Sequence, residues 1–458
     1  MHKKMDISGI ASQGQNMQVN RFMKKIGEIP QSVMLGATMA ICLLYRIYFF
    51  GYLNPNMVLY NSDSVSYFAP VDILRGTVDL YRTPLYSMVI EFFEYLSKEN
   101  LVSNLILFQQ VVSFLSIIPF FYVSEKIIRN RFFSVAATLF YGLWHPILIQ
   151  NVHLNPESLC FAGSVLLLFI LVSYLERPRK PAALALGVFP FFLVMLKPTY
   201  LITLGVVLML FVTRYFVLRE ERKILYWGFA GILLSVLGTV GYCAMNYRHN
   251  GQFVLSNIAL NNTIAHISIS GAYDYGKDDE LMAIIDRTRH INYYAAPFTI
   301  NNHFIDNYKI CEKRFPKNLP PTTDMIFCLR MPDTVNYPPE RIKRFIRNSQ
   351  CTMVYAKYML KRLFDIVVAA YGGLFLLLLF QSLVLAHVFV KHKEIGWAQV
   401  FCILFVLGQF ISIWLAGLDD MDRHLIPSYP FFIQIAGAFG MAVTAIFKKE
   451  GLRGLMVR

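Results

Sequence analysis

One short stretch of the sequence carries residue types that could do chemistry. It is NSDSVSYFAPVDILRGTVDLYRTPLYS, residues 61–87, and it directly follows the first long apolar run of the chain. Asp63 and Tyr67 are four residues apart, so on a helix they would share one face. A carboxylate in that position can accept the proton of a hydroxyl group that lies within hydrogen-bond reach. The alternative is that Asp63 only caps a helix, as Asp often does beside Asn and Ser.

Four basic residues are candidates for binding a phosphate group. Arg75 and Arg82 lie in the same stretch, whereas Lys197 and Arg423 come from distant parts of the sequence. All four map to one predicted membrane face, where the phosphate of a membrane-bound ligand would lie. Arg fits phosphate through two parallel hydrogen bonds, and Lys binds it as a point charge. For each residue, the alternative is that the side chain snorkels to lipid headgroups.

Further polar residues are predicted at the same face. The motif VHLNPESL places His153 and Glu157 beside an apolar run, and LDDMDRHLIPSYP places Asp422 and His424 before the last one. Ionisable groups at membrane depth usually serve a pathway or a site. For the second motif, the alternative is a solvated cap on a helix hairpin. The predicted substrate contacts are Tyr67, Tyr86, His153, Glu157, Asp422 and His424.

The elements that must position these residues are membrane helices. Of the 458 residues, 56% are hydrophobic and only 16% are charged, which is far from the composition of a soluble domain. Apolar runs of about 20 residues, the length that crosses a bilayer, recur along the chain. They predict an all-α polytopic membrane protein with about ten transmembrane helices. The predicted spans are 31–53, 101–124, 132–150, 157–175, 181–197, 199–217, 225–245, 363–390, 397–416 and 425–446.

The Lys and Arg residues predict the orientation of these spans. The net charge of +14 comes largely from clusters in short loops at the span ends, which argues against nucleic acid as a partner. With the N-terminus inside, every inside loop is basic and the short outside loops carry few basic residues, as the positive-inside rule requires. The sequence therefore predicts a multi-pass protein of the cell inner (plasma) membrane. Both termini would be cytoplasmic and the candidate residues extracytoplasmic.

Two long outer loops interrupt the helical pattern. Loop 54–100 is predicted to contain surface helices, one of them opened by Pro84. In the second loop, GAYDYGKDDELMAIIDRTR and YPPERIKRFIRNSQCTMVYAKYMLKRLFD predict the helices of a small cap, the latter running directly into the span at 363. The predicted organisation is a cytoplasmic tail (1–30), an N-terminal transmembrane module (31–245), the outer loop (246–361), a C-terminal transmembrane module (362–447) and a second tail (448–458).

The cysteines leave one question open. Cys311, Cys328 and Cys351 lie in the second outer loop, where one disulfide and three free thiols are both compatible with the sequence. The other four cysteines fall in or at the ends of predicted spans and are expected to behave as small buried hydrophobic residues. No spacing resembles a zinc site or a glycine-rich phosphate loop.

The first outer loop resembles a signature of the GT-C fold glycosyltransferases that use polyprenyl-phosphate sugars. This group contains the aminoarabinose transferases of lipid A and the protein O-mannosyltransferases. Its members carry an acidic residue followed by an aromatic one, then a Leu-Gly element, then an Arg-x-Pro-Leu-Tyr stretch. Here these are Asp63, Tyr67, residues 74–76 and RTPLYS at 82–87. Looser matches follow in order over most of the chain, namely NPESL, YRHNGQFVLSN and DRHLIPSYPFF.

The resemblance implies a membrane glycosyltransferase that moves a sugar from a polyprenyl-phosphate donor to a lipid, glycan or protein acceptor on the extracytoplasmic face. Asp63 matches the catalytic acidic position of the family, and displacement opposite the leaving phosphate would invert the anomeric centre. Many members carry two adjacent acidic residues there, whereas Ser64 follows Asp63. A divalent-metal cofactor is therefore an open alternative, and no cofactor is assigned. A transporter or flippase of lipid-linked sugars is the alternative function, although internal repeats are not evident.

Overall fold

The protein folds as an assembly of helices. The computed structural model describes residues 29–60, 64, 66–68, 71, 82–256, 263, 266–267, 270–276, 338–392, 395–416, 425 and 428–447. Within these residues, the one β contact is an isolated parallel bridge between Leu59 and His153. The predicted all-α fold class is therefore confirmed.

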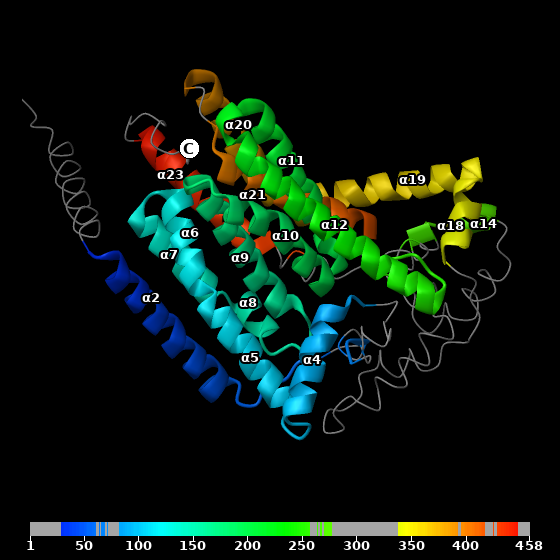
Figure 1. Ribbon diagram of the computed structural model, residues 1–458, viewed down its shortest axis with the longest axis horizontal. Coiled ribbons are helices and arrows are strands. Elements are labelled where there is room, and N and C mark those ends of the chain that lie inside the picture. The colour runs from blue at the N-terminus through cyan, green and yellow to red at the C-terminus, as the bar shows by residue number, and fades with distance from the viewer. Residues whose placement is uncertain are drawn as a thin grey trace, which may run out of the picture.

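The helices follow one another through short connections in the first half of the chain (Figure 1). A π-helical turn, Ile47–Leu53, continues the first helix, and a 3-10 turn, Pro198–Tyr200, precedes α11. The α-helices up to residue 250 are α2 (Gln31–Arg46), α4 (Pro84–Leu96), α5 (Leu101–Leu115), α6 (Ile117–Ile128), α7 (Arg131–Leu143), α8 (His145–Gln150), α9 (Glu157–Glu176), α10 (Lys180–Leu196), α11 (Leu201–Val217) and α12 (Arg222–Asn250). Those beyond it are α14 (Tyr273–Gly276), α18 (Pro338–Ile346), α19 (Ser349–Phe364), α20 (Gly372–His392), α21 (Trp397–Ala416) and α23 (Tyr429–Phe447).

Each predicted span overlaps a helix of the described residues, but the helices differ in length. Seven in the described part of the chain are long and apolar enough to cross a membrane. They include Gln31–Leu53, Leu101–Ile128 and Arg219–His249. Three apolar helices are shorter: Arg131–Leu143, Lys180–Leu196 and Tyr429–Thr444. The protein is therefore a multi-pass membrane protein, while the count of ten spans stays a prediction.

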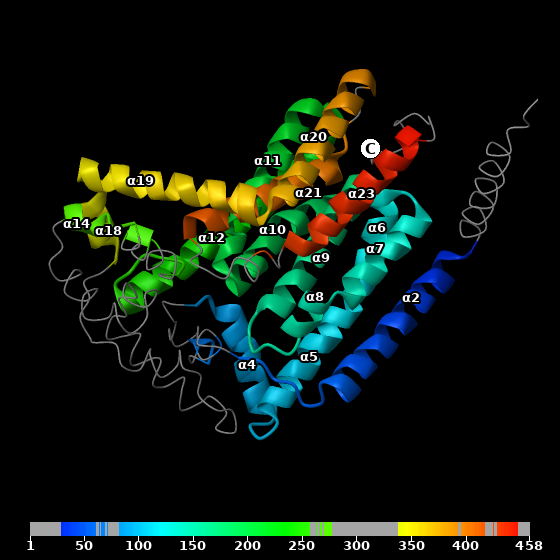
Figure 2. The same ribbon diagram turned by 180° about the vertical axis from the view of Figure 1, so that it is seen from behind.

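The predicted continuous helix from the second outer loop into span 363–390 is wrong. After α19 the chain forms a π-helical turn, Asp365–Ala370, and leaves helical geometry at Tyr371 (φ −130°, ψ 23°). Gly372 and Gly373 follow, and glycine raises the entropic cost of continuing a helix. In both Figure 1 and Figure 2, α19 projects sideways from the bundle while α20 runs along it. The candidate membrane helix therefore begins at Gly372, and α19 is a separate helix before it.

The predicted span 132–150 is also not one helix. It consists of α7, which has 13 residues, and α8, which has 6. Between them Trp144 is extended (φ −66°, ψ 116°). Pro146 explains part of this break, because its ring cannot donate a hydrogen bond to the previous turn. The extended backbone at Trp144 makes α8 a separate short helix.

Helices α10 and α12 pack unusually close together. A Cβ atom added at Gly187 would lie 2.4 Å from the carbonyl oxygen of Gly228, and one at Gly231 would lie 2.5 Å from that of Leu184. Small residues allow this approach, which is a common way to join membrane helices. Ser235 adds a hydrogen bond across the contact, from its Oγ to the Gly187 carbonyl at 2.7 Å. This contact fixes α12, which reaches from one end of the bundle to the other.

The cysteine prediction can be tested in part. Cys351, in α19, is a buried free thiol. It packs with Ile267, Ala272 and Phe345 in a small apolar cluster. Cys311 and Cys328 lie outside the described residues, so a disulfide in this loop would have to join those two.

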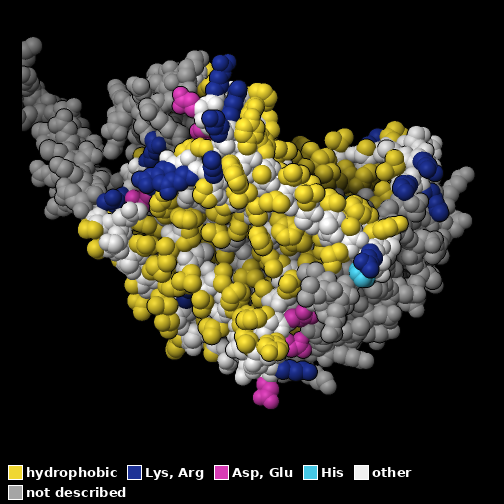
Figure 3. Space-filling model, viewed as in Figure 1, with side chains coloured by type: hydrophobic (Ala, Val, Ile, Leu, Met, Phe, Trp, Pro, Cys, Tyr) yellow, Lys and Arg dark blue, Asp and Glu magenta, His cyan; other side chains and the backbone are white. Residues whose placement is uncertain are grey.

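The two ends of the bundle carry different side chains. Figure 3 shows a broad apolar face, with Lys and Arg side chains gathered along its upper edge over α6, α7 and α11. We call this the basic end; the α6–α7, α9–α10 and α11–α12 connections lie there. The opposite edge, near α4, shows several acidic side chains (Figure 3), and we call it the α4 end. The basic end corresponds to the predicted cytoplasmic face.

Candidate active site at the α4 end

A buried ion pair joins the start of α9 to the end of α10. Lys197 Nζ donates a hydrogen bond to Glu157 Oε1 at 3.1 Å, and the two side chains are 7% and 2% exposed. Glu157 is the first residue of α9, where the helix N-terminus favours a carboxylate. Lys197 ends α10 in extended geometry (φ −153°, ψ 124°), because the following Pro198 disfavours helical backbone at the preceding residue.

Gln109 in α5 connects three parts of the site. Its side-chain amide donates to the backbone carbonyls of Asn151 and His153 at 3.0 and 2.9 Å. Its carbonyl oxygen accepts from the Tyr86 hydroxyl at 2.8 Å. Ser158, in the first turn of α9, donates to the Asn151 side chain at 2.9 Å. These bonds hold the 151–156 connection against α4 and α5.

Arg82, just before α4, lies among aromatic and polar side chains. Its guanidinium carbon is 4.6 Å from the centre of the Tyr67 ring, and its Nε donates to Ser66 Oγ at 2.7 Å. The Tyr67 ring meets the Tyr86 ring edge to face, with 5.2 Å between centres. Tyr242 of α12 donates to the Arg82 carbonyl at 3.3 Å. Arg82 thus lies among residues of the 66–67 segment, α4 and α12 and is 7% exposed.

The first outer loop is anchored to the bundle on both sides of Pro70. Ser64, which follows Asp63 in sequence, is fully buried and donates to the Asn155 side chain at 2.9 Å. Val71 donates its backbone N–H to Glu91 Oε1 of α4 at 2.7 Å. These contacts connect the loop with the residues that precede α9 and with the surface of α4.

Tyr86 links the aromatic cluster to the ion pair. Burial raises the pKa of its hydroxyl well above the ordinary value, and the nearby Glu157 carboxylate and Tyr67 raise it further. The phenol therefore stays neutral and serves as a hydrogen-bond donor to Gln109. Tyr67, Arg82, Tyr86, His153, Glu157 and Lys197 consequently belong to one connected cluster. The predicted residues Asp63, Arg75, Asp422, Arg423 and His424 lie outside the described residues.

Several members of this cluster were not among the predicted site residues. They are Ser64, Ser66, Gln109, Asn151, Asn155, Ser158 and Tyr242. The sequence does contain a signal for Gln109. This residue is polar but lies in the apolar run LILFQQVV, and a polar residue in such a run usually has a function or a buried partner. The serines and asparagines gave no comparable signal, because they are common in connections.

A metal site is not formed by the described residues. Within them, no group of three or more His, Cys, Asp or Glu side chains could hold a metal ion. Asp63 and residues 419–424 lie outside this part of the chain. Whether the acidic residues of these two segments, Asp63 and residues 419–424, hold a divalent metal stays open.

The fold is similar to that of archaeal oligosaccharyltransferases from Archaeoglobus fulgidus. One structure contains zinc and sulfate; it has 13% sequence identity and a TM-score of 0.48 and covers 90% of this chain. A second, of AglB with an inhibitory peptide and a dolichol-phosphate, has 10% identity, a TM-score of 0.49 and 91% coverage. A third, the apo form, has 12% identity, the same score and the same coverage.

This chain spans about half the length of those proteins, covering 49% to 51% of them. The similarity concerns the arrangement of helices and assigns no donor, acceptor or catalytic residue. No protein-family model and no curated protein matches the sequence.

Proposed function

We propose that this protein is a membrane glycosyltransferase with its active site at the α4 end. The donor would be a polyprenyl-phosphate-linked sugar and the acceptor a hydroxyl group of a lipid, glycan or protein on the extracytoplasmic face. The order of the loop motifs supports this function. The observation that carries it is the anchoring of the 64–67 segment, next to Asp63 in sequence, against Asn155 and Arg82. A loop that only connected two helices would not need such buried polar contacts.

In the proposed reaction, the acceptor oxygen attacks the anomeric carbon of the sugar. Its proton passes to the Asp63 carboxylate, while the bond between the anomeric carbon and the phosphate oxygen breaks. Polyprenyl phosphate leaves with the electron pair of that bond, and the configuration at the anomeric carbon is inverted. Asp63 is a weak base, so a large part of its contribution would be the orientation of the hydroxyl group.

The cations would stabilise the charge that develops on the leaving phosphate. We assign Arg75, Arg82, Lys197 and Arg423 to this task. Of these, Arg82 and Lys197 are described, and each already contacts another group, Ser66 and Glu157 respectively. Donor binding would therefore add a phosphate to a preformed polar network. The Glu157 carboxylate would partly neutralise Lys197 and so weaken the attraction between Lys197 and the phosphate.

The proposed substrate contacts fall into two groups. Tyr67, Tyr86, His153 and Glu157 lie in the connected cluster, in which the Tyr67 ring contacts Arg82 and Glu157 pairs with Lys197. Asp422 and His424 would come from the connection before α23. A divalent metal, if the enzyme used one, would be held by carboxylates of the two acidic loops, because hard cations prefer oxygen ligands.

The proposal is tested by transfer from a radiolabelled polyprenyl-phosphate sugar, with the purified protein in detergent. Asp63→Asn should lower the rate of transfer at least about 100-fold, the usual contribution of a general base. Glu99→Gln is the matched control, because Glu99 is exposed at the same end, in the connection between α4 and α5. It should leave the rate unchanged.

Two results would overturn the assignment. Unchanged transfer by Asp63→Asn would remove the catalytic role of this carboxylate. Movement of the lipid-linked sugar across a vesicle membrane without any transfer product would indicate a transporter. Both variants must be recovered from the membrane in wild-type amounts.

A further inference from the structure

A second polar site lies at the basic end, away from the candidate active site. It is a cavity of about 1260 Å³. Its walls come from the end of α6, the α9–α10 connection, the end of α11 with the turn that follows, and the start of α21. Helices that cross the bilayer therefore meet around an opening at the predicted cytoplasmic surface.

Positive charge dominates this cavity. Among the described residues, its lining contains five basic side chains, Lys126, Arg129, Arg177, Arg179 and Arg214, and two carboxylates, Glu176 and Glu221. Both carboxylates already have partners. Glu176 pairs with Lys126 and accepts from the Tyr122 hydroxyl, and Glu221 is bound by Arg214 and Tyr174.

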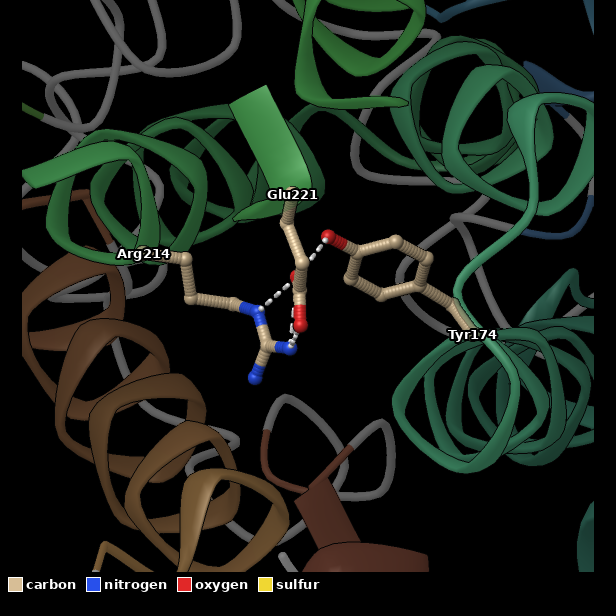
Figure 4. Close-up of polar contacts among 3 residues, drawn as sticks. All are labelled: Tyr174, Arg214 and Glu221. Carbon is tan, nitrogen blue, oxygen red and sulfur yellow. Dashed lines mark hydrogen bonds and ion pairs between the residues drawn. The ribbon is translucent and has the colours of Figure 1, made fainter. Parts of the chain in front are cut away.

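Arg214 is a buried residue in the lining of the cavity (Figure 4). Its Nη2 donates to the two oxygens of Glu221 at 2.6 and 2.7 Å, and its Nε donates to one of them at 3.1 Å. The guanidinium carbon lies 5.4 Å from the Tyr174 ring centre and 5.2 Å from that of Trp397. The residue is only 2% exposed. Two aromatic rings and a carboxylate thus hold the guanidinium in one orientation.

One nitrogen of Arg214 has no hydrogen-bond partner in the part of the chain that the structure describes. Nη1 is buried and donates to no acceptor among the described residues, and Figure 4 shows it pointing away from Glu221. A buried donor without an acceptor costs free energy, so native structures rarely leave one. Because Arg214 lines the cavity, an anion inside the cavity is well placed to accept from it.

Two further arginines flank the opening. Arg177 and Arg179 lie on either side of Pro178 in the short α9–α10 connection, and both are exposed. Neither side chain makes a hydrogen bond or an ion pair with the described part of the chain; only their backbone groups do, with Ser173 and Ala183. The connection therefore presents two guanidinium groups beside the buried one of Arg214. Such groups suit phosphate, whose several oxygens accept paired N–H donors.

We propose that this cavity binds a phosphate group, held by Arg177, Arg179 and Arg214. Basic pockets between membrane helices on the cytoplasmic side typically take the phosphate of a lipid headgroup. Trp397 and Tyr122 lie at the same level, as aromatic residues do at a membrane surface. A soluble phosphate ester has the same chemistry and would use the same three residues. The site is independent of the proposed transfer reaction at the α4 end.

Binding of fluorescent phosphatidic acid to the purified full-length protein in neutral detergent tests the proposal. The wild type should bind this lipid more tightly than fluorescent phosphatidylcholine. The double variant Arg177→Gln/Arg179→Gln should weaken phosphatidic acid binding by about tenfold or more, since each surface cation contributes appreciably to binding an anionic lipid. These residues are exposed, so the fold should persist, which an unchanged unfolding temperature would verify.

The matched control is Arg219→Gln/Lys223→Gln. Both residues are exposed at the same end, Arg219 in the α11–α12 connection and Lys223 in the first turn of α12, and neither lines the cavity. This variant should bind as the wild type does. An equal loss in both double variants, or equal binding of the two lipids by the wild type, would overturn the proposal.

Two additional measurements sharpen the result. Arg214→Lys keeps the positive charge but loses the planar guanidinium group with its paired N–H donors. It should weaken phosphatidic acid binding if the guanidinium contacts the phosphate. If that variant fails to fold, the exposed double variant alone decides. Glycerol 3-phosphate as a competitor identifies the source: displacement of the lipid at millimolar concentration indicates a soluble ester, and retention of the lipid indicates a headgroup.

Discussion

Two ion pairs at opposite ends of the same helical bundle, one buried and one partly exposed, illustrate how access to solvent changes what a pair can do. At the α4 end, Lys197 and Glu157 are 7% and 2% exposed and meet through one hydrogen bond of 3.1 Å. At the basic end, Arg214 is 3% exposed but Glu221 is 18% exposed, and three hydrogen bonds join them. The first pair is almost fully buried, whereas the second borders an open cavity. The first should therefore be more sensitive to the loss of one partner.

The largest effect is expected from Lys197→Met. This variant leaves the Glu157 carboxylate buried without its ammonium partner, and we expect the free energy of unfolding to fall by about 3 to 5 kcal/mol. Chemical unfolding in mixed detergent micelles measures it. Lys98→Met is the control, because Lys98 is exposed between α4 and α5 and should cost less than about 0.5 kcal/mol. Adding Glu157→Gln should recover most of the loss, and no recovery would contradict the pairing.

A smaller effect is expected from Arg214→Met. Glu221 is more exposed than Glu157, so water can solvate its carboxylate when the guanidinium is removed. The expected loss is about 2 to 3 kcal/mol, in the range of hydrogen bonds to charged groups. The same unfolding measurement applies, with exposed Arg219→Met as the control. A loss as large as that of Lys197→Met would show that solvent access does not distinguish the two ends.

Gln109→Leu tests whether the α4 end depends on its hydrogen-bond network. The variant leaves the Asn151 and His153 carbonyls and the Tyr86 hydroxyl without their Gln109 partner. Unsatisfied buried polar groups typically cost 1 to 3 kcal/mol, and we expect about 2 kcal/mol here. The neighbouring Gln110→Leu is the control, because the Gln110 side chain is only half-buried. Equal losses in the two variants would rule out a special role for Gln109.

The smallest effect is expected from Tyr86→Phe, and it should depend on pH. At neutral pH the variant loses the bond to Gln109, which should cost about 1 kcal/mol. The pKa of Tyr86 is raised in the folded protein, so its neutral form stabilises the fold below the unfolded pKa of about 10. That contribution is lost as the pH rises further, because only the unfolded chain ionises. The cost of Tyr86→Phe should therefore shrink above pH 10, and a constant cost would contradict it.

The helices could be predicted well from the sequence, and their interruptions less well. The surface helix predicted to begin at Pro84 is α4. It begins at that residue and has 13 residues, too few to span a membrane. The helix that enters the predicted span at 363 does not continue through it, because Tyr371 and two glycines interrupt it. The span 132–150 was wrong at Trp144, where the backbone becomes extended. Apolar composition indicates which segments enter a membrane, but it does not show where a helix is interrupted inside an apolar run.

The candidate site could be predicted only in part. The sequence analysis placed Glu157 and Lys197 at one predicted face with different roles, and the structure joins them in an ion pair; the roles themselves stay predictions. It missed Gln109, whose importance depends on three partners that are 23 to 44 residues away in the chain. The proposed roles of Asp63, Arg75, Asp422, Arg423 and His424 stay predictions.

The sequence by itself determined that this chain forms membrane helices with basic connections on one predicted side, because hydrophobicity, helical period and charge are properties of short segments. Only the tertiary structure decided that Lys197 meets Glu157, that Gln109 ties together α4 and the start of α9, and that Arg214 faces a basic cavity. Such partnerships join residues from different helices. They depend on how closely the helices pack, which the glycines of α10 and α12 permit but do not specify alone.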